Sequence, residues 1–338
     1  MIHRIRGRLN RHWERHKHQR GVQKVKQHST LIQWQAPIKG EGSVLCLVKD
    51  GMEHLDSFVK HYQGLGFRHF VFLDNGSSDK TIDYLKSIEC TVYQCRLNYE
   101  KYIYAMKQFM VHSLGENHWS LYVDVDELWL YPGMKTLSLE DFLEYLDHHS
   151  FNACQGHMLD MFGETISFNN QPLNEVPLQQ AYPYFTLSGL IQSPLQRYFI
   201  QSDGRRFQYH GGVNKHFFDL DKIYLSKIPL IKWNRKMIVH ESSHISKYIQ
   251  LADVSCALLH YKFTNTFFQK AQKIVNEKRD AWAVEYYGQI LGALDNKNTS
   301  LVDESTRRFE SAQQLVQLGF IDVSSAFLSF EDQMNIND

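Results

Sequence analysis

The chain has 338 residues, of which 43% are hydrophobic and 22% charged, and its formal net charge is zero. This length and composition predict a globular protein of one large or two medium domains, and they exclude a fibrous or wholly disordered chain. No apolar run approaches the roughly 18 residues that a transmembrane helix needs, the N-terminus lacks the apolar segment of a secretory signal, and the five cysteines form no CxxC pair; we therefore expect a cytoplasmic protein.

Residues 1–40 are predicted to form a basic N-terminal arm. They carry ten Lys and Arg, five His and one Glu, so the rest of the chain has about nine excess negative charges. Ile2, Ile5, Leu9 and Trp13 recur at helical spacing, which would suit a short amphipathic helix in peripheral contact with an anionic membrane on its cytoplasmic face. The alternative is a loosely docked basic arm. Nucleic acid is not an expected partner.

Residues 41–150 alternate between strand and helix patterns. Apolar runs at 44–48, 70–73 and 119–123 are typical of buried strands, and an apolar stripe over 55–62 predicts a core-facing helix. Strands that alternate with helices indicate a parallel α/β sheet with right-handed connections.

The second half of the chain has a less regular pattern. Residues 151–264 contain short strand-like pieces, and residues 265–338 are predicted to be a C-terminal helical region. Within that region we expect helices over 265–291 and 306–319, followed by a frayed tail after Ser325.

The most informative stretch is Asp124-Val125-Asp126, which ends the apolar run 119–123. Strand side chains repeat every two residues, so both carboxylates point to one face. Ligands of open parallel sheets bind just outside the carboxyl ends of the strands. Two carboxylates there suit a hard divalent cation that keeps positions open for phosphate oxygens. The alternative is a solvated acidic turn.

Two other strand ends should lie at the same edge of the sheet. Lys49 could meet a phosphate, and Asp74 could accept hydrogen bonds from a base or ribose. Asp79 is well placed to cap the helix that follows it. These three residues are candidate nucleotide contacts, and the alternatives are a surface lysine and a helix-capping loop without a ligand.

Later in the chain, His260 follows two leucines and is either a buried core histidine or a ligand of an ion such as Mn²⁺. Lys262 could balance phosphate charge. The segment 240–244 matches the HExxH zinc-protease pattern, but its β-branched and serine neighbours are weak helix formers, so we reject that function. The segment 205–215, with two arginines and a Gly-Gly pair, predicts either an anion grip or a glycine hairpin.

In their order, these motifs resemble those of glycosyltransferase family 2-like enzymes with a GT-A fold, most closely a bacterial subgroup with a DxD motif. The resemblance covers roughly residues 43–320, and the matching segments are Val48–Gly51, Asp74–Asp79, Asp124–Glu127, Gly211–Val213, Leu225–Trp233 and Leu259–Phe263. It implies an α/β fold with a Rossmann-like, mostly parallel sheet. Residues 41–150 would bind the nucleotide-sugar, residues 151–264 would form an irregular acceptor half, and helices would follow.

The resemblance also implies roles for single residues. Asp124 and Asp126 match the DxD motif, which holds Mn²⁺ or Mg²⁺ against the diphosphate of a nucleotide-sugar, and Asp124 would also contact the donor. Asp74 matches the acidic residue near base and ribose, and His260 matches a late metal-binding histidine. The family's acidic residue after the first strand is replaced by Gly51.

The predicted activity is therefore metal-dependent transfer of a sugar from a nucleotide-sugar to a hydroxyl acceptor on a glycan or lipid-linked molecule, with inversion. The acceptor hydroxyl needs a general base. The candidates are Asp160, Glu164, Asp203 and Glu241, and we favour Asp160, which lies in a strand-like run. Glu127 would either contact the ligands of the metal and so adjust the metal site, or pair with a nearby Lys or Arg. The alternatives are a degenerate nucleotide-sugar-binding protein, or a metal-dependent nucleotidyltransferase or phosphohydrolase.

Overall fold

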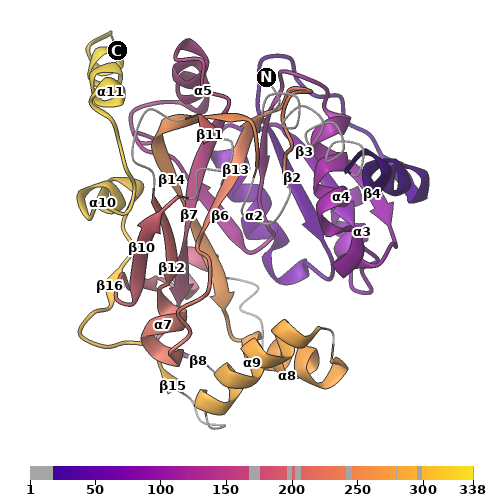
Figure 1. The fold of residues 1–338 in the computed structure, drawn as a ribbon, viewed down its shortest axis with the longest axis vertical. Coiled ribbons are helices and arrows are strands. Elements are labelled where there is room, and N and C mark those ends of the chain that lie inside the picture. The colour runs from indigo at the N-terminus through magenta and orange to yellow at the C-terminus, as the bar shows by residue number, and fades with distance from the viewer. Residues whose placement is uncertain are drawn as a thin grey trace, which may run out of the picture.

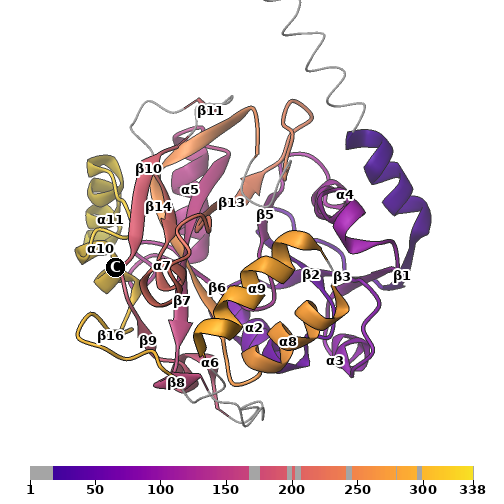
Figure 2. The same cartoon turned by 60° about the horizontal axis from the view of Figure 1, so that its bottom comes forward.

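The structure is a computed structural model that describes residues 18–166, 176–195, 200–201, 207–240, 246–278, 280–294 and 299–337. Its strands are β1 (Ser29–Gln33), β2 (Ser43–Val48), β3 (His69–Asp74), β4 (Thr91–Cys95), β5 (Trp119–Tyr122), β6 (Glu127–Leu130), β7 (Ala153–Phe162), β8 (Thr165–Ile166), β9 (Tyr184–Phe185), β10 (Leu190–Pro194), β11 (Ile200–Gln201), β12 (Phe207–Gly211), β13 (Ser226–Lys232), β14 (Ile249–Phe263), β15 (Thr299–Ser300) and β16 (Arg307–Arg308). Its helices are a first helix over residues 18–28, then α2 (Met52–Gly64), α3 (Thr81–Lys86), α4 (Tyr99–Ser113), α5 (Leu139–His148), α6 (Leu178–Ala181), α7 (Val213–Phe218), α8 (Phe267–Glu277), α9 (Ala281–Leu294), α10 (Ala312–Gln317) and α11 (Ser325–Asn337). Figures 1 and 2 show their arrangement.

One twelve-stranded sheet runs through the described part of the chain. Its first half has the strand order β4-β3-β2-β5, and all of these neighbours are parallel. From β2 the chain moves outward to β3 and β4, then returns to place β5 on the other side of β2. Ligands of doubly wound sheets bind at such a reversal of strand order, here between β2 and β5. The predicted α/β class with a Rossmann-like sheet is confirmed.

Helices cover both faces of this parallel half (Figure 1). Cys46 on β2 packs into one core with Phe58 of α2 and Leu85 of α3, whereas its neighbour Leu45 packs into a second core with Met106 of α4. Because adjacent strand residues point to opposite faces, a continuously apolar strand is required here. The apolar run of β2 therefore follows from burial on both sides.

The second half of the sheet combines antiparallel and parallel pairs. β13 lies between β5 and β7 and is antiparallel to both, and the long strand β14 pairs in parallel with β7 and in antiparallel with β6. In this register His260 of β14 lies opposite Asp160 of β7 on one side and Glu127 of β6 on the other. The sheet register therefore brings together residues that are far apart in sequence.

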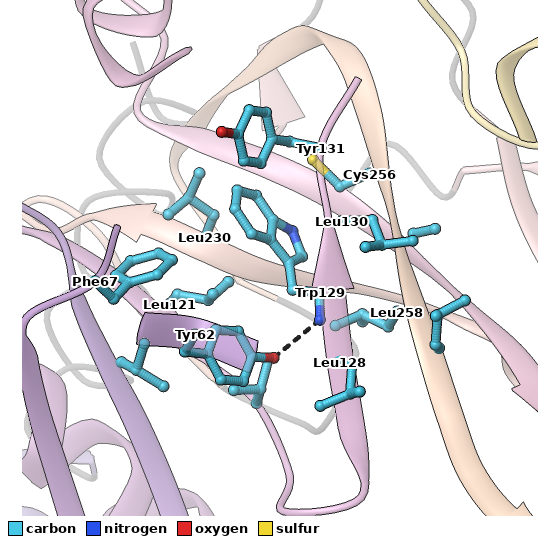
Figure 3. Close-up of a cluster of buried hydrophobic side chains, with 14 of the residues drawn as sticks. Tyr62, Phe67, Leu121, Leu128, Trp129, Leu130, Tyr131, Leu230, Cys256 and Leu258 are labelled. Atoms are coloured by element: carbon cyan, nitrogen blue, oxygen red, sulfur yellow. Dashed lines mark hydrogen bonds between the residues drawn. The ribbon is translucent and has the colours of Figure 1, made fainter. Parts of the chain in front are cut away.

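The strand that follows Asp126 is anchored by an aromatic core (Figure 3). The Tyr62 hydroxyl donates to the Glu127 carbonyl oxygen at 2.9 Å and accepts from the Trp129 N–H at 3.0 Å. Trp129 is fully buried, and its ring centre lies 6.2 Å from that of Phe67. This packing fixes the position of the backbone that directly follows Asp126.

The C-terminal region differs from the predicted helices. The expected helix over 265–291 is two helices, because Lys278 takes a left-handed conformation with φ of 50° at the end of α8. The expected helix over 306–319 contains the short strand β16 before α10. The tail is not frayed after Ser325: α11 packs Phe327 fully buried, with its ring centre 5.0 Å from that of Tyr145.

Within the described part of the N-terminal arm, the helix over residues 18–28 docks on the domain through Val25, which is fully buried. The proposed amphipathic stretch from Ile2 to Trp13 lies outside the described residues. Among the residues that are described, none of the helices is both long and apolar enough to cross a membrane.

Because of two half-buried histidines, we expect the stability of the fold to decrease at acidic pH. Burial lowers the pKa of His61 and of His112 to about 4, although His61 gains a 2.8 Å hydrogen bond to the Trp129 carbonyl oxygen. The unfolded chain takes up these protons near pH 6.5, so between about pH 6.5 and 4 it binds more protons than the folded chain. Stability should therefore fall as the pH drops through this window, by about 1–2 kcal/mol per histidine after allowance for partial exposure.

Urea denaturation at pH 7.0 and 4.5 measures this effect. His61→Gln should reduce the difference between the two pH values, whereas His28→Gln, at an exposed position of the first helix, should leave it unchanged. Equal loss of stability in wild type and His61→Gln would contradict the assignment.

Candidate functional site

Asp124 and Asp126 lie at the carboxyl end of β5, next to the reversal of strand order. The Val123 N–H still donates to the Leu45 carbonyl oxygen at 3.1 Å, so the chain leaves the sheet directly at Asp124. The side chain of Asp124 is 44% exposed and that of Asp126 29% exposed. Both predicted carboxylates are therefore accessible at the edge where the sequence places them.

Asp124 is surrounded by cationic and hydroxyl donors. The Lys227 ammonium lies 3.5 Å from one of its oxygens, and the Tyr122 hydroxyl donates to the other at 3.0 Å. The Lys107 ammonium, which is nearly buried and lies 4.3 Å from the centre of the Tyr122 ring, is 4.0 Å from that second oxygen. Burial raises the pKa of Asp124, but the two lysines outweigh it and hold the pKa low, at about 2. The carboxylate is ionised and its charge is already compensated.

Glu127 and Lys227 form a buried ion pair beneath Asp124. The exposed fractions of their side chains are 1% and 6%, and the Lys227 ammonium donates directly to the Glu127 carboxylate. The same carboxylate accepts the Asp124 N–H at 2.9 Å. Burial would lower the pKa of Lys227, but attraction to Glu127 and Asp124 raises it above its ordinary value. The pairing alternative predicted for Glu127 is thus realised with a lysine of β13.

Asp126 faces His260 of β14. Its Oδ2 lies 3.6 Å from Nε2 of the imidazole, and Nδ1 of the same ring donates to Oδ1 of Asp160 at 2.6 Å. Burial disfavours the imidazolium, but hydrogen bonds to Asp126 and Asp160 raise the pKa of His260 to about 10. The row Asp126–His260–Asp160 joins the DxD segment to the interior of the second half of the sheet.

Both oxygens of the buried Asp160 carboxylate accept hydrogen bonds from protein groups. Its side chain is 1% exposed, and its second oxygen accepts the Asn214 amide at 3.0 Å. The Tyr286 hydroxyl of α9 donates to Oδ1 of the Asn214 side chain and accepts from the Lys262 ammonium at 2.6 Å. Lys262 therefore contacts Tyr286 at the edge of this polar row, and its predicted role with phosphate stays a prediction.

The other predicted nucleotide contacts serve the loops between strands. Asp74 is fully buried, and its carboxylate accepts the N–H groups of Gly76 at 3.0 Å and Ser77 at 3.1 Å. Asp79 accepts the N–H of Thr81, the first residue of α3, at 2.9 Å, but the N-cap position of this helix is Lys80 and not Asp79. Lys49 is exposed beside this loop. Ligand contacts by these three residues stay predictions.

The turn after β2 contains Gly51 where the resemblance implies an acid, and before it Asp50, which binds the neighbouring loop. Its carboxylate accepts the Ser78 N–H at 2.6 Å, and it takes a left-handed conformation with φ of 52°. Burial raises its pKa, but the hydrogen bonds from Ser78 and Asp79 lower it overall. A Cβ added at Gly51 would lie 2.5 Å from Cγ2 of Val48, so this turn has no room for an acidic side chain there.

Among the candidate general bases, Glu164 is exposed, while Asp203 and Glu241 lie outside the described residues, as does most of the HExxH-like segment. Of the segment 205–215, residues 207–211 form β12, which is antiparallel to β10, and Gly211 and Gly212, both with positive φ, join β12 to α7. The Gly-Gly pair therefore leads from a strand into a helix and is not the turn of a glycine hairpin, and the anion grip stays a prediction.

Sequence reasoning missed four residues of the site: Lys107, Lys227, Asn214 and Tyr286. Lys227 lies in a segment that was matched as a whole, and a lysine within a largely apolar strand is a usable signal for a buried ion pair. Lys107 sits beside the apolar stripe of α4 and has no comparable local signal.

Asp126 and His260 are the side chains of this site that could contact a cation, whereas Asp124 is already engaged by other protein groups. A histidine that binds a metal typically donates its other ring nitrogen to a carboxylate, and Asp160 takes this position towards His260. Asp124 is instead occupied by Lys227, Lys107 and Tyr122. Within the described residues no group of three or more His, Cys, Asp and Glu could hold an ion. A cation here would have two protein ligands and would need oxygen atoms from water or substrate.

No protein-family model matches the chain, and no curated protein sequence matches it. Two solved structures of the glycosyltransferase TarS from S. aureus show a partial likeness. The structure of TarS 1–349 is 18% identical with a TM-score of 0.28, over 39% of this chain and 45% of that one. A second TarS structure is 19% identical with a TM-score of 0.28, over 39% of this chain and 26% of that one. The chain thus spans less than half of either TarS structure.

Proposed function

We propose that this chain is a glycosyltransferase that moves a sugar from a nucleotide-sugar to a hydroxyl acceptor with the help of Mn²⁺ or Mg²⁺. The observation that carries the proposal is the row Asp126–His260–Asp160 at the carboxyl end of β5, beside the reversal of strand order between β2 and β5. That edge is where doubly wound sheets bind nucleotides. The order of the motifs resembles that of family 2-like enzymes, and this resemblance is the reason for proposing that the nucleotide carries a sugar.

The charges of the site suit a departing nucleoside diphosphate. Asp126 and His260 would hold the cation, and His260 would first have to release the proton that Asp126 and Asp160 favour on its ring. When bound, the cation acts as a Lewis acid towards the phosphate oxygens. Lys107 and Lys227 surround Asp124 and keep it ionised and oriented by contacts at 4.0 and 3.5 Å. Asp124 would then accept hydrogen bonds from hydroxyl groups of the donor instead of binding the ion.

Asp160 is better suited to orienting His260 than to removing a proton from the acceptor. Both of its oxygens already accept hydrogen bonds, from His260 and Asn214, and the side chain is 1% exposed. An acceptor hydroxyl would have to displace one of these partners to reach it. We therefore assign Asp160 a positioning role, in place of the general-base role that the sequence predicts.

A second candidate function is nucleotide-sugar binding without turnover. It is favoured by Asp124 and Asp74, whose carboxylates are committed to protein partners. A metal-dependent nucleotidyltransferase or phosphohydrolase is distinguished by its product, since it would release phosphate or pyrophosphate from nucleotides that carry no sugar.

Binding of a nucleoside diphosphate should depend on the cation and on Asp126. With UDP or GDP at about 100 times Kd and Mn²⁺ present, we expect the thermal midpoint to rise by about 5 °C. Asp126→Asn should remove most of the Mn²⁺-dependent part of this shift. Asp56→Asn, on the exposed face of α2, is the matched control and should behave as wild type.

The same samples separate the candidate functions. Sugar transfer in the presence of Mn²⁺ supports the glycosyltransferase, and a shift without any turnover supports the binding protein. If neither UDP nor GDP nor their sugars shift the midpoint with Mn²⁺ present, the proposed function is wrong.

A further inference from the structure

Trp282 lies in the first turn of α9 and is 62% exposed. Among the large hydrophobic side chains of the described residues, it is the second most exposed. Single exposed aromatics are common on protein surfaces, so exposure alone has no meaning. Its contacts and its position distinguish Trp282 from the others.

The indole of Trp282 lies flat on a fixed tyrosine. The ring centres of Trp282 and Tyr286 are 5.1 Å apart and their planes differ by 5°. Tyr286 is 3% exposed, its hydroxyl bonds to Asn214, and the Lys262 ammonium lies 4.1 Å from its ring centre. Because Tyr286 is held by these contacts, one face of the indole has a rigid support and a large part of its surface stays open to solvent.

This aromatic pair adjoins the candidate active site. Asn214, which accepts from Tyr286, donates to Asp160 at 3.0 Å, and Asp160 accepts from His260 at 2.6 Å. The preceding helix α8 is tied to the start of α2, where Thr266 donates to Glu53 at 2.6 Å. Figures 1 and 2 show α8 and α9 side by side. The exposed indole is therefore three side-chain contacts away from Asp160, on the side of the second half of the sheet.

We propose that Trp282 is a stacking platform for a sugar ring of the acceptor, so that the acceptor is a glycan. This inference rests on the proposed function. A pyranose ring has an apolar face of C–H groups and a polar rim, and a flat indole binds that face while the hydroxyl groups stay in water. Because Tyr286 already fixes the indole plane, little conformational freedom is lost on binding.

Isothermal titration calorimetry with cellohexaose, maltohexaose and chitohexaose tests this platform on the full chain. At least one of the three should bind the wild type, and Trp282→Ala should weaken its affinity by about tenfold or more. Trp282→Phe keeps a flat ring and should recover affinity to within about threefold of wild type. Trp34→Ala is the matched control, because Trp34 is also exposed, at 57%, but follows the edge strand β1 far along the sheet order from β14.

The outcomes separate this inference from the proposed function. Equal affinity of Trp282→Ala and wild type, or no binding of any of the three oligosaccharides to the wild type, overturns the platform. Binding of UDP or GDP with Mn²⁺ is measured on the same variants and should be unchanged by Trp282→Ala. If the nucleotides fail to bind while oligosaccharide affinity still depends on Trp282, the platform stands and the proposed transfer reaction falls.

Discussion

Replacing Lys227 by methionine is expected to lower the free energy of unfolding by about 3–5 kcal/mol. The methionine fills a similar volume, but it leaves Glu127 buried without a partner: the side chain of Glu127 is 1% exposed and that of Lys227 6%. Removing one member of a buried ion pair strands the other charge in a medium of low dielectric constant. Urea denaturation at pH 7 measures the effect, and Lys227→Met should shift the midpoint without a large change in slope.

The double variant Lys227→Met with Glu127→Gln identifies the stranded charge as the cause. Glutamine keeps an oxygen that can accept the Asp124 N–H, which Glu127 now accepts at 2.9 Å. The double variant should therefore recover much of the stability that Lys227→Met loses. Lys232 lies on the same strand as Lys227 and forms a more exposed ion pair with Asp147 of α5. Lys232→Met should therefore lower the free energy of unfolding by less than about 1 kcal/mol. Equal losses in the single and double variants would contradict this account.

The ion pair also explains why part of the site could be predicted and part could not. The position of Asp124 and Asp126 follows from local pattern, since a short apolar run must end where the sheet ends. The partners Lys107 and Lys227 come from α4 and β13, and only the pairing of β13 with β5 brings Lys227 to Asp124. A single sequence contains no signal for that long-range register.

His260 illustrates the same limit from the opposite side. The two leucines before it predict burial, which a core histidine and a metal ligand share. The register of β14 against β6 and β7, which sets His260 opposite Glu127 and Asp160, decides what surrounds it. This register depends on a strand of 15 residues pairing with two others, and its hydrophobic pattern alone does not specify it.

The sequence around Asp74 contains a local signal for a turn, to which the sequence analysis gave less weight than to the resemblance. An aspartate followed by Asn-Gly-Ser is typical of a turn in which the carboxylate accepts backbone N–H groups two and three residues later. The structure has this arrangement, with bonds to Gly76 and Ser77. The short-range chemistry of the turn therefore predicts these two contacts of Asp74, and its contact with a nucleotide stays a prediction.

Asp126→Asn is expected to lower kcat/KM for sugar transfer by about 10²–10³-fold, while Asp124→Asn should cost less. In the proposed site Asp126 shares the cation with His260, whereas Asp124 is compensated by Lys227 at 3.5 Å and Lys107 at 4.0 Å. An amide lacks the negative charge that holds a divalent ion, so the loss at Asp126 should be accompanied by a higher Mn²⁺ requirement. Initial rates over a Mn²⁺ titration, with release of the nucleoside diphosphate as the readout, measure both quantities.

The same titration separates the two roles considered for Asp160. As a positioning residue it acts through His260, so Asp160→Asn should raise the Mn²⁺ concentration for half-maximal rate by about 10–100-fold, with kcat largely restored at saturating Mn²⁺. A lost general base would leave kcat low at every Mn²⁺ concentration, since no added ion removes the proton from the acceptor. Asp56→Asn serves again as the surface control. A Mn²⁺ requirement that is the same in wild type, Asp126→Asn and Asp160→Asn would show that this row of side chains does not hold the cation, and the charge of the leaving group would then have to be met by Lys107 and Lys227.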